Sequence, residues 1–327
     1  MIHLLLFILG FIFLIKGADI LVDGSSSIAR KLGISTFVIG LTVVAFGTST
    51  PELIISILAS FQEKSGIALG NIIGSNITNI LLILGVAAVI SPLTVKKGTV
   101  NKEIPLSLLS VLAVLFLVND QIIDNLVPNG LTRIDGLILL LFFSIFIYYT
   151  FGITKSKENI LQKTAGTLKQ ENVKEYSGFL SAGMIILGLV GLGVGGKIIV
   201  DSASAIALAW GLSESFVGLT IIALGTSLPE LAASIVAAKK DKADMAVGNV
   251  VGSNIFNLLW VLGLASVFSP ISFDARVNWD ILFLFAINIL LLFLIYIGRK
   301  NILARREGVA LLVLYVVYII LLLLGII

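Results

Sequence analysis

An internal repeat constrains the fold of this chain more than any other feature. When the sequence is compared with itself at a shift of 178 residues, positions 40–93 align with positions 218–271 without a gap. Of these 54 positions, 29 are identical. The match weakens outside this block, although Asp23 still aligns with Asp201. Internal similarity at a fixed shift predicts two structural units of one design.

The composition places both units in a membrane. Hydrophobic residues make up 58% of the chain and charged residues 13%, against about 25% charged residues in typical soluble domains. Apolar runs recur from end to end, and a helix needs about 20 such residues to cross a bilayer. The chain has no cysteine and its one histidine is His3, so disulfides and thiolate metal sites are excluded.

The alternation of apolar runs and polar breaks predicts an all-α polytopic membrane protein with ten transmembrane helices. Each half of the chain holds five of them, and five is odd, so the second half enters the membrane from the opposite side. Such inverted repeats are typical of secondary transporters, which bind their substrates near the midplane between the repeats. The expected spans are 2–22, 34–61, 67–90, 103–119, 133–152, 178–200, 213–238, 245–268, 278–298 and 308–326.

The basic residues predict the orientation. If the N-terminus lies outside, the inside loops carry 17 Lys and Arg residues and the outside ends carry 4. Cytoplasmic loops are enriched in these residues, so both termini are expected outside the cell. The predicted units are a first five-helix repeat over 1–152, a Lys-rich cytoplasmic linker over 153–177, and a second five-helix repeat over 178–327. The net charge of +3 does not indicate a nucleic-acid partner.

A Pro-Glu pair interrupts an apolar segment in each repeat. The stretch "AFGTSTPELIISI" starts at Ala45, and "ALGTSLPELAASI" starts at Ala223. Proline has no backbone N–H and clashes with the carbonyl four residues earlier, so Pro51 frees the carbonyl of Gly47. Pro229 does the same for Gly225. Within a bilayer a freed carbonyl must find a partner or line a polar cavity, and a cation is one such partner.

The glutamates of these pairs are the strongest candidates for function. A carboxylate at mid-membrane is costly unless it is paired, and no basic residue lies near mid-span in the four spans that carry the motifs. Glu52 and Glu230 are therefore either protonated or neutralised by cations. Hydroxyl groups three and four residues before each glutamate share its side of the helix, at Ser49, Thr48, Ser227 and Thr226.

A second duplicated motif adds further oxygen atoms. "GNIIGSNITN" places Asn71, Ser75 and Asn79 on one stripe of a helix, and "GNVVGSNIFN" repeats the stripe with Asn249, Ser253 and Asn257. All the candidate ligands are oxygens, which favours hard cations over zinc or copper. Two glutamates would balance one Ca²⁺ or two Na⁺, so exclusive occupancy and exchange follow naturally.

Three other functions are weighed against cation exchange driven by Na⁺. Exchange of protons for Ca²⁺ stays open, because an unpaired buried glutamate can carry a proton. A passive channel would differ by conducting without a coupling ion. An intramembrane hydrolase is disfavoured, because no Ser-His or Cys-His pair can form within the membrane. We expect no enzymatic activity, no cofactor and no obligate protein partner.

The motifs "GTSTPE", "GTSLPE" and the two "GNxxGSN" segments resemble those of the cation/Ca²⁺ antiporter superfamily, in particular its Na⁺/Ca²⁺ exchanger branch. The resemblance implies a ten-helix fold whose core comprises the second, third, seventh and eighth spans, with the first and sixth spans as gating helices. It implies a prokaryotic plasma membrane as the setting. It also implies ion ligands at Glu52, Glu230, Thr48, Thr226, Ser49, Ser227, Ser75, Ser253 and Asn79, with backbone carbonyls at Ala45 and Ala223.

One position departs from the pattern of the family. Many members carry an aspartate where this chain has Asn257, so both halves here carry asparagine, at positions 79 and 257. The predicted site includes Asn257 but holds two formal charges instead of three. The ratio of the exchanged ions, and any role of K⁺, therefore does not follow from the resemblance.

Overall fold

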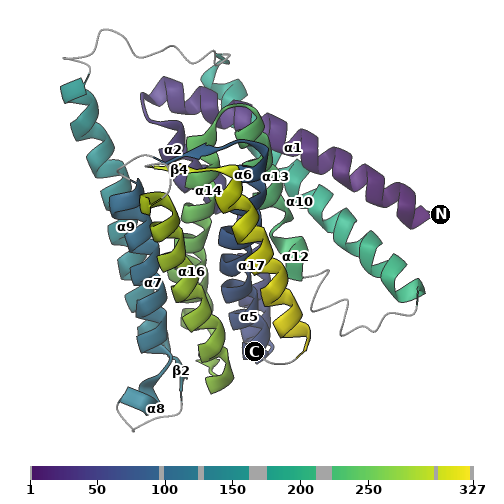
Figure 1. Ribbon diagram of the computed structural model, residues 1–327, viewed down its shortest axis with the longest axis vertical. Coiled ribbons are helices and arrows are strands. Elements are labelled where there is room, and N and C mark those ends of the chain that lie inside the picture. The colour runs from purple at the N-terminus through teal and green to yellow at the C-terminus, as the bar shows by residue number, and fades with distance from the viewer. Residues whose placement is uncertain are drawn as a thin grey trace.

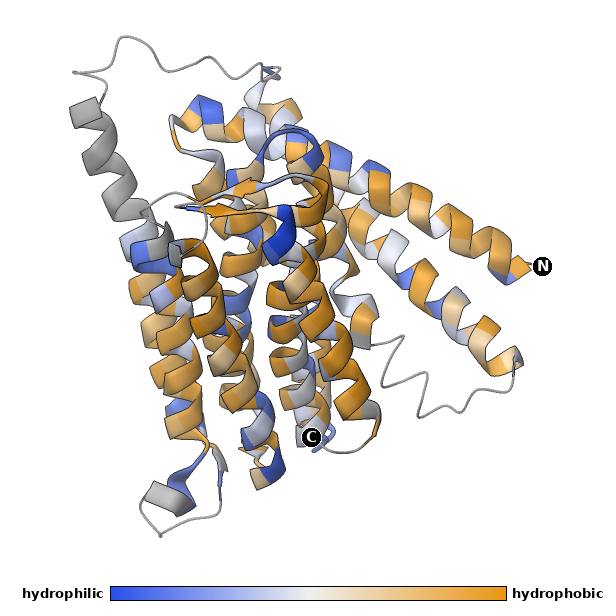
Figure 2. Cartoon of the chain, viewed as in Figure 1, coloured by the Kyte–Doolittle hydropathy of each residue, from blue (hydrophilic) through white to orange (hydrophobic). Residues whose placement is uncertain are grey.

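The molecule is almost entirely helical (Figure 1). The computed structural model describes residues 2–95, 99–123, 129–161, 175–210, 223–297 and 301–324. Hydrophobic residues cover most of the length of the helices, and hydrophilic residues gather toward helix ends and connections (Figure 2). This distribution is the one that a bilayer requires, because the hydrocarbon layer excludes unpaired polar groups.

The first half contains helices of very different lengths. Three of its segments are π-helical, labelled η1, η2 and η3. The elements are α1 (Ile2–Leu32), α2 (Thr36–Ile39), η1 (Gly40–Val44), α3 (Ala45–Thr48), α4 (Thr50–Phe61), α5 (Ser65–Thr78), η2 (Asn79–Ile83), α6 (Leu84–Ile90), β1 (Leu93–Thr94), η3 (Thr99–Glu103), α7 (Ile104–Leu117), α8 (Asp120–Ile123), β2 (Gly130–Leu131) and α9 (Arg133–Leu161).

The second half repeats the succession of long, broken and π-interrupted helices. Its elements are α10 (Gly178–Ala209), α12 (Ala223–Thr226), α13 (Leu228–Lys239), α14 (Ala243–Ile255), the π-helical η5 (Phe256–Val261), α15 (Leu262–Phe268), β3 (Ile271–Ser272), the 3-10 turn η6 (Ala275–Val277), α16 (Asn278–Ile297), β4 (Ile302–Leu303) and α17 (Arg305–Leu323).

The number of spans agrees in part with the sequence prediction. Six helices among the described residues are long and apolar enough to cross a membrane, or seven if the bent pair Thr36–Thr48 and Thr50–Phe61 is one span. The described helix α7 lies within another predicted span, and α17 and the pair α12 and α13 overlap two more. Residues 213–222 of the predicted seventh span lie outside the described residues. The count of ten helices remains a prediction.

The helices differ in how deeply the protein buries them. Within the apolar 18-residue stretch of the span Ser65–Ile90, 78% of the residues are buried, and within that of Ala243–Phe268, 83% are buried. Within the corresponding stretches of α1 and α10, 33% and 28% of the residues are buried. The first pair therefore forms the centre of the molecule, and α1 and α10 lie at its periphery, where Figure 1 shows them extending away from the bundle.

Helices α1 and α10 pack against each other through glycines. Gly17 and Gly24 on α1 lie close to Gly188 and Ser181 on α10. A Cβ atom added at Gly17 would lie 2.7 Å from the backbone nitrogen of Leu192, closer than real Cβ contacts. Small residues at helix interfaces allow the backbones to approach, and the resulting van der Waals packing helps helices to associate in lipid.

Ion pairing connects α1 to the core at one end of α13. The ammonium of Lys240, which caps the C-terminus of α13, lies 2.8 Å from Asp23 Oδ1 and 3.3 Å from Asp19 Oδ1 on α1. It also donates to the backbone carbonyl of Asp19 at 3.1 Å. These side chains are 30–44% exposed, so the contact is partly shielded from solvent.

Two short antiparallel strand pairs connect the halves of the chain. In the first, Leu93 pairs with Leu303, and in the second, Leu131 pairs with Ile271. Each pair therefore joins a strand of the first half to a strand of the second half, as β1 with β4 and β2 with β3.

Helix α9 continues into the segment that the sequence predicts as the linker. Helix α9 continues to Leu161, nine residues beyond position 152, where the first five-helix unit was expected to end. Lysine and glutamate are good helix formers, so a Lys-rich stretch can extend a helix beyond its apolar part. Positions 162–174 of the predicted linker lie outside the described residues.

Replacing Gly188 by alanine is expected to weaken the contact between α1 and α10. The new Cβ would lie 2.7 Å from the backbone nitrogen and from the Cβ of Leu21, so the helices would have to separate. We expect Gly188→Ala to cost about 1–3 kcal/mol of stability, measured as a lower unfolding temperature in detergent. Gly183→Ala is the control, because no described atom lies within 4 Å of its added Cβ. Equal losses in both variants would contradict close packing at Gly188.

Candidate cation-binding site

The helix breaks place two glutamates in the centre of the protein. Helix α3 ends at Thr48 and α4 begins at Thr50, with a bend of 44° between the two segments. In the second half, α12 ends at Thr226 and α13 begins at Leu228. Proline stands in the first turn of each following helix, where its missing N–H is tolerated. Glu52 and Glu230 follow directly and are buried, with 1% and 0% of their surface exposed.

The two halves meet at these glutamates. The hydroxyl of Ser49, from the first half, donates to Glu230 Oε1 at 3.1 Å. Glu52 Oε1 accepts from the hydroxyl of Ser75 at 3.3 Å. The hydroxyl of Thr226 also interacts with Glu52, so residues from both repeats surround this carboxylate.

The negative charges of the two carboxylates have little compensation from the protein. Among the ion pairs of the described residues, none involves Glu52 or Glu230. Each glutamate lies in the first turn of a 12-residue helix, whose N-terminal dipole favours an anion. That contribution is small beside the several kcal/mol needed to desolvate a carboxylate. The arrangement therefore favours neutralisation of the glutamates, either by bound cations or by protons.

Two asparagines hold the turns that carry the glutamates. The amide nitrogen of Asn71 donates to the backbone carbonyl of Glu52 at 3.2 Å and to the Ser56 hydroxyl at 2.9 Å. Asn249 makes the same two bonds in the second half, to the carbonyl of Glu230 at 3.3 Å and to Ser234 at 3.0 Å. The duplicated bonds fix α5 against α4 and α14 against α13.

Asn249 also reaches across to the first half. The hydroxyl of Thr48 donates to Asn249 Oδ1 at 3.2 Å and lies 3.4 Å from the carbonyl oxygen of Ala45. Through these contacts the end of α3 is connected to α14.

Four further asparagines pair across the central helices. Asn79 donates to Asn254 Oδ1 at 3.0 Å, and Asn257 donates to Asn76 Oδ1 at 3.2 Å. All four are buried. Asn79 begins the π-helical segment η2, and Asn257 is the second residue of η5. Segments of this type are frequent at functional sites, because they displace side chains relative to a regular helix.

Several buried oxygens remain without a hydrogen-bond partner among the described residues. They belong to side chains that the sequence motifs single out: Glu52 Oε2, Glu230 Oε2, Ser227 Oγ, Ser253 Oγ, Asn79 Oδ1 and Asn257 Oδ1. Unpaired buried polar atoms are rare in native proteins, and a bound ion is one explanation for them. Oxygen donors of these types suit Na⁺ and Ca²⁺.

The predicted backbone ligands lie at the helix breaks. Ala45 is buried in α3, and its carbonyl accepts the N–H of Ser49 at 3.0 Å. Ala223 is the first residue of α12. The carbonyls of Gly47 and Gly225 lack their regular helical donors, because prolines stand four residues later.

The structure thus brings the side chains of both duplicated motifs to one region and adds two members. Sequence reasoning omitted Asn76 and Asn254, although both belong to the duplicated "GSN" triplets. Both positions carry asparagine in the aligned repeats, and this identity was the signal that could have identified them. Each of the two pairs with an asparagine of the opposite half.

The chain is similar to known exchangers over most of its length. The chain matches the family described as sodium/calcium exchanger protein over residues 2–152 and 180–324. The sodium/calcium exchanger MaX1 of Methanosarcina acetivorans is 34% identical over 347 residues, which is 98% of each chain. The Ca(2+)/H(+) antiporter ChaA of Bacillus subtilis is 26% identical over 243 residues, 71% of this chain and 68% of that relative.

A solved structure matches over nearly the whole chain. The sodium-calcium exchanger NCX_Mj, soaked with Na⁺ and Ca²⁺, superposes with a TM-score of 0.80 and is 36% identical, covering 98% of both chains. At this identity and coverage the two proteins share one fold.

The paired asparagines are expected to stabilise the central interface. Asn254→Ala leaves the buried amide of Asn79 without its acceptor, which should cost about 1–3 kcal/mol. When both side chains are removed, no amide is left without an acceptor. The double variant Asn79→Ala/Asn254→Ala should therefore lose less unfolding free energy than the sum of the two single losses. The measurement is the unfolding free energy in mixed detergent.

Asn101→Ala is the matched control for this cycle. It removes a hydrogen bond between asparagine and Tyr296 at the exposed surface, and we expect a change within about 0.5 kcal/mol. Strictly additive losses at Asn79 and Asn254 would contradict a coupled pair.

Proposed function

Because this chain belongs to the sodium/calcium exchanger protein family, we propose that it exchanges Na⁺ for Ca²⁺ across the plasma membrane of a prokaryotic cell. The broader function, exchange of a cation for Ca²⁺ by a membrane antiporter, follows from the family and the matched relatives. The choice of Na⁺ as the coupling ion is supported by the names of MaX1 and NCX_Mj.

One observation carries this proposal. Two buried carboxylates, Glu52 and Glu230, face a set of neutral oxygens and have no counter-ion among the described residues. One Ca²⁺ neutralises both charges, and so do two Na⁺. Since the same charges cannot serve both ions at once, binding of one ion releases the other.

The proposed ligands are the residues of the duplicated motifs. The carboxylates bind Ca²⁺ most strongly, because Ca²⁺ prefers six to eight oxygens with several charged donors. The hydroxyls and amides complete the positions for Na⁺. The proposed set comprises Glu52, Glu230, Thr48, Thr226, Ser49, Ser227, Ser75, Ser253, Asn79 and Asn257, with the carbonyls of Ala45 and Ala223.

The proposed architecture is two inverted five-helix repeats with both termini outside. Residues 1–152 and 178–327 form the repeats, and 153–177 form the cytoplasmic linker. The match of one family description to both 2–152 and 180–324 supports this division. Alternating access would then arise when one set of helices moves against the other around the shared site.

Exchange of protons for Ca²⁺ is the second candidate. The buried glutamates favour it, because a carboxylate that lacks a counter-ion can also be neutralised by a proton. The match to the Ca(2+)/H(+) antiporter ChaA supports the same alternative at lower identity.

Neutralising either glutamate should abolish exchange. Glu52→Gln and Glu230→Gln keep the size of the side chain but remove one of the two charges that hold Ca²⁺. We expect Ca²⁺ uptake by proteoliposomes to fall to the level of protein-free liposomes, with an unchanged unfolding temperature or a higher one. Glu63→Gln in an exposed loop is the control and should retain uptake. Retained uptake in a Glu52 or Glu230 variant would remove that residue from the site.

The coupling ion is tested by imposing single gradients. Proteoliposomes loaded with Na⁺ and diluted into Na⁺-free buffer should accumulate Ca²⁺, with or without K⁺. A pH gradient alone should not drive uptake, because the hydroxyl and amide oxygens suit Na⁺. Uptake driven by the pH gradient alone would overturn the assignment of Na⁺ and establish proton exchange.

A further inference from the structure

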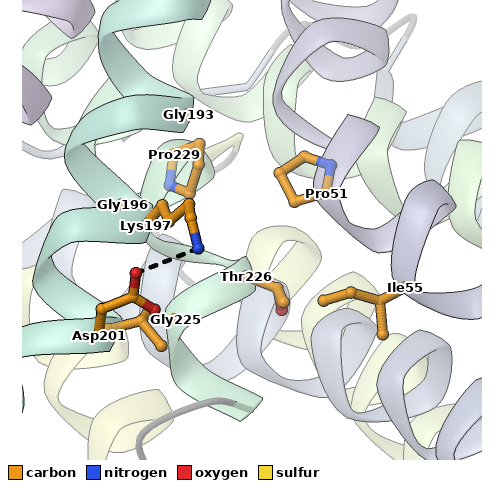
Figure 3. A pocket seen from close by; sticks show the side chains of 10 residues that line it. Pro51, Ile55, Gly193, Gly196, Lys197, Asp201, Gly225, Thr226 and Pro229 are labelled. Atoms are coloured by element: carbon orange, nitrogen blue, oxygen red, sulfur yellow. Dashed lines mark ion pairs between the residues drawn. The ribbon is translucent and has the colours of Figure 1, made fainter. Parts of the chain in front are cut away.

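A cavity opens beside the candidate site, between α4, α10 and the α12–α13 break (Figure 3). Its volume is about 230 Å³. Pro51 and Ile55 lie on one side, and Gly193 and Gly196 of α10 lie on the other side (Figure 3). Val200 of α10 also lines the cavity. Thr226 and Pro229 lie at the break between α12 and α13.

The inner end of this cavity lies next to the carboxylates. Thr226 lines the cavity, keeps 7% of its surface exposed and interacts with Glu52. The lining prolines, Pro51 and Pro229, directly precede Glu52 and Glu230 in the sequence. The cavity therefore reaches one candidate ligand directly, at Thr226, and its walls adjoin the two glutamates in sequence.

Two of the described residues that line the cavity are charged, Lys197 and Asp201, and the others are neutral. Lys197 Nζ lies 3.1 Å from Asp201 Oδ2, one helical turn away on α10, as the dashed line in Figure 3 shows. Their side chains are 76% and 62% exposed. An exposed pair of this kind adds little to stability, but each of its charges contributes to the potential inside the cavity.

The corresponding positions on α1 are arranged differently. At the shift of 178 residues, Lys197 corresponds to Asp19 and Asp201 to Asp23. On α1 both aspartates contact Lys240, which belongs to the core, whereas Gln62 stands at the position that corresponds to Lys240. On α10 the two charges instead pair within one helix. No ion pair of the described residues therefore bridges α10 to α4 across the cavity.

We propose that Lys197 and Asp201 set the electrostatic potential of this cavity, and hence the selectivity, by ion charge, for the exchanged ions that pass through it. This inference rests on the proposed exchange of cations at the neighbouring glutamates. Lys197 lowers the local concentration of cations, and Asp201 offsets that effect. The pair determines specificity from a distance and does not bind the ion at the central site.

The proposal has a quantitative signature. The local concentration of an ion depends exponentially on the product of its charge and the local potential. A change in potential that alters the local concentration of Na⁺ by about threefold therefore alters that of Ca²⁺ by about ninefold. A change in folding or in helix position does not generate this squared relation.

The potential can be measured without any transport. The chain has no cysteine, so Gly193→Cys introduces a single thiol into the cavity wall. No described atom lies within 4 Å of a Cβ built at Gly193, so the new side chain has space. The readout is the ratio of the modification rates by a cationic and an anionic methanethiosulfonate reagent. Gly183→Cys, on the same helix but outside the cavity lining, is the control.

Opposite changes are expected from the two charge removals. In the Gly193→Cys protein at low ionic strength, Lys197→Gln should raise the ratio of cationic to anionic modification by about tenfold. Asp201→Asn should lower it by about tenfold, and the double variant should stay within about twofold of the parent. The Gly183→Cys control should change by less than about twofold. Changes of the same sign, or equal changes at the control position, would overturn the proposal.

The second measurement tests selectivity in proteoliposomes. At low ionic strength, Lys197→Gln should lower the KM for Ca²⁺ by about ninefold and the half-saturating Na⁺ concentration by about threefold, with kcat unchanged. Asp201→Asn should raise both by the same factors. At about 0.5 M of an inert salt both effects should largely disappear, since the Debye length falls to a few ångströms. Equal factors for the two ions, or effects that persist in salt, would overturn the proposal.

The two measurements separate this proposal from the proposed function. If uptake of Ca²⁺ does not depend on Na⁺, the proposed function fails, whereas the cysteine measurement still reports the potential of the cavity. If exchange occurs but the modification ratios do not respond to Lys197 and Asp201, the proposed role of the pair is wrong and the central site stands.

Discussion

The helix breaks beside Glu52 and Glu230 are the constraint on which the rest of the structure depends. An unbroken helix would leave these carboxylates on a regular surface with all carbonyls paired. The prolines instead end one helix and begin another, so each glutamate lies at a helix N-terminus and the preceding carbonyls lose their donors. Asn71 and Asn249 then hold the new geometry through the glutamate carbonyls. Groups that favour an anion and groups that favour a cation are thereby placed together in the buried interior of the protein.

The two halves share a design but differ in their contacts. Ser49 donates to Glu230, whereas its counterpart Ser227 has no partner among the described residues. Lys240 connects α13 to α1, whereas its counterpart is the neutral Gln62. In the proposed alternating access, the two halves adopt unequal arrangements in any one state, because identical arrangements would open both sides or neither. The contacts of Ser49 and Ser227 differ in this way, whereas Lys240 and Gln62 are a permanent difference between the halves.

The sequence predicted the broken helices and the buried glutamates, because duplicated motifs restrict the geometry twice, and the set of ion ligands stays a prediction. Its weaker results have physical reasons. Helix α9 continues beyond residue 152, because helix propensity does not end where hydrophobicity ends. The pairing of Asn79 with Asn254 depends on how α5 and α14 cross, which periodicity along one helix does not report. The glycine packing of α1 on α10 likewise depends on their relative position.

The asparagine at position 257 links the charge of the site to the packing of the core. An asparagine side chain can donate a hydrogen bond through its nitrogen and, at the same time, coordinate a cation through its oxygen. Asn257 donates to Asn76 while its Oδ1 is unpaired among the described residues, and Asn79 does the same with Asn254. An ionised aspartate at position 257 would add a charge but lose the donor, and its oxygen would then face Asn76 Oδ1. A change in the number of charges at this site therefore also requires a rearrangement of the contact between the two central helices.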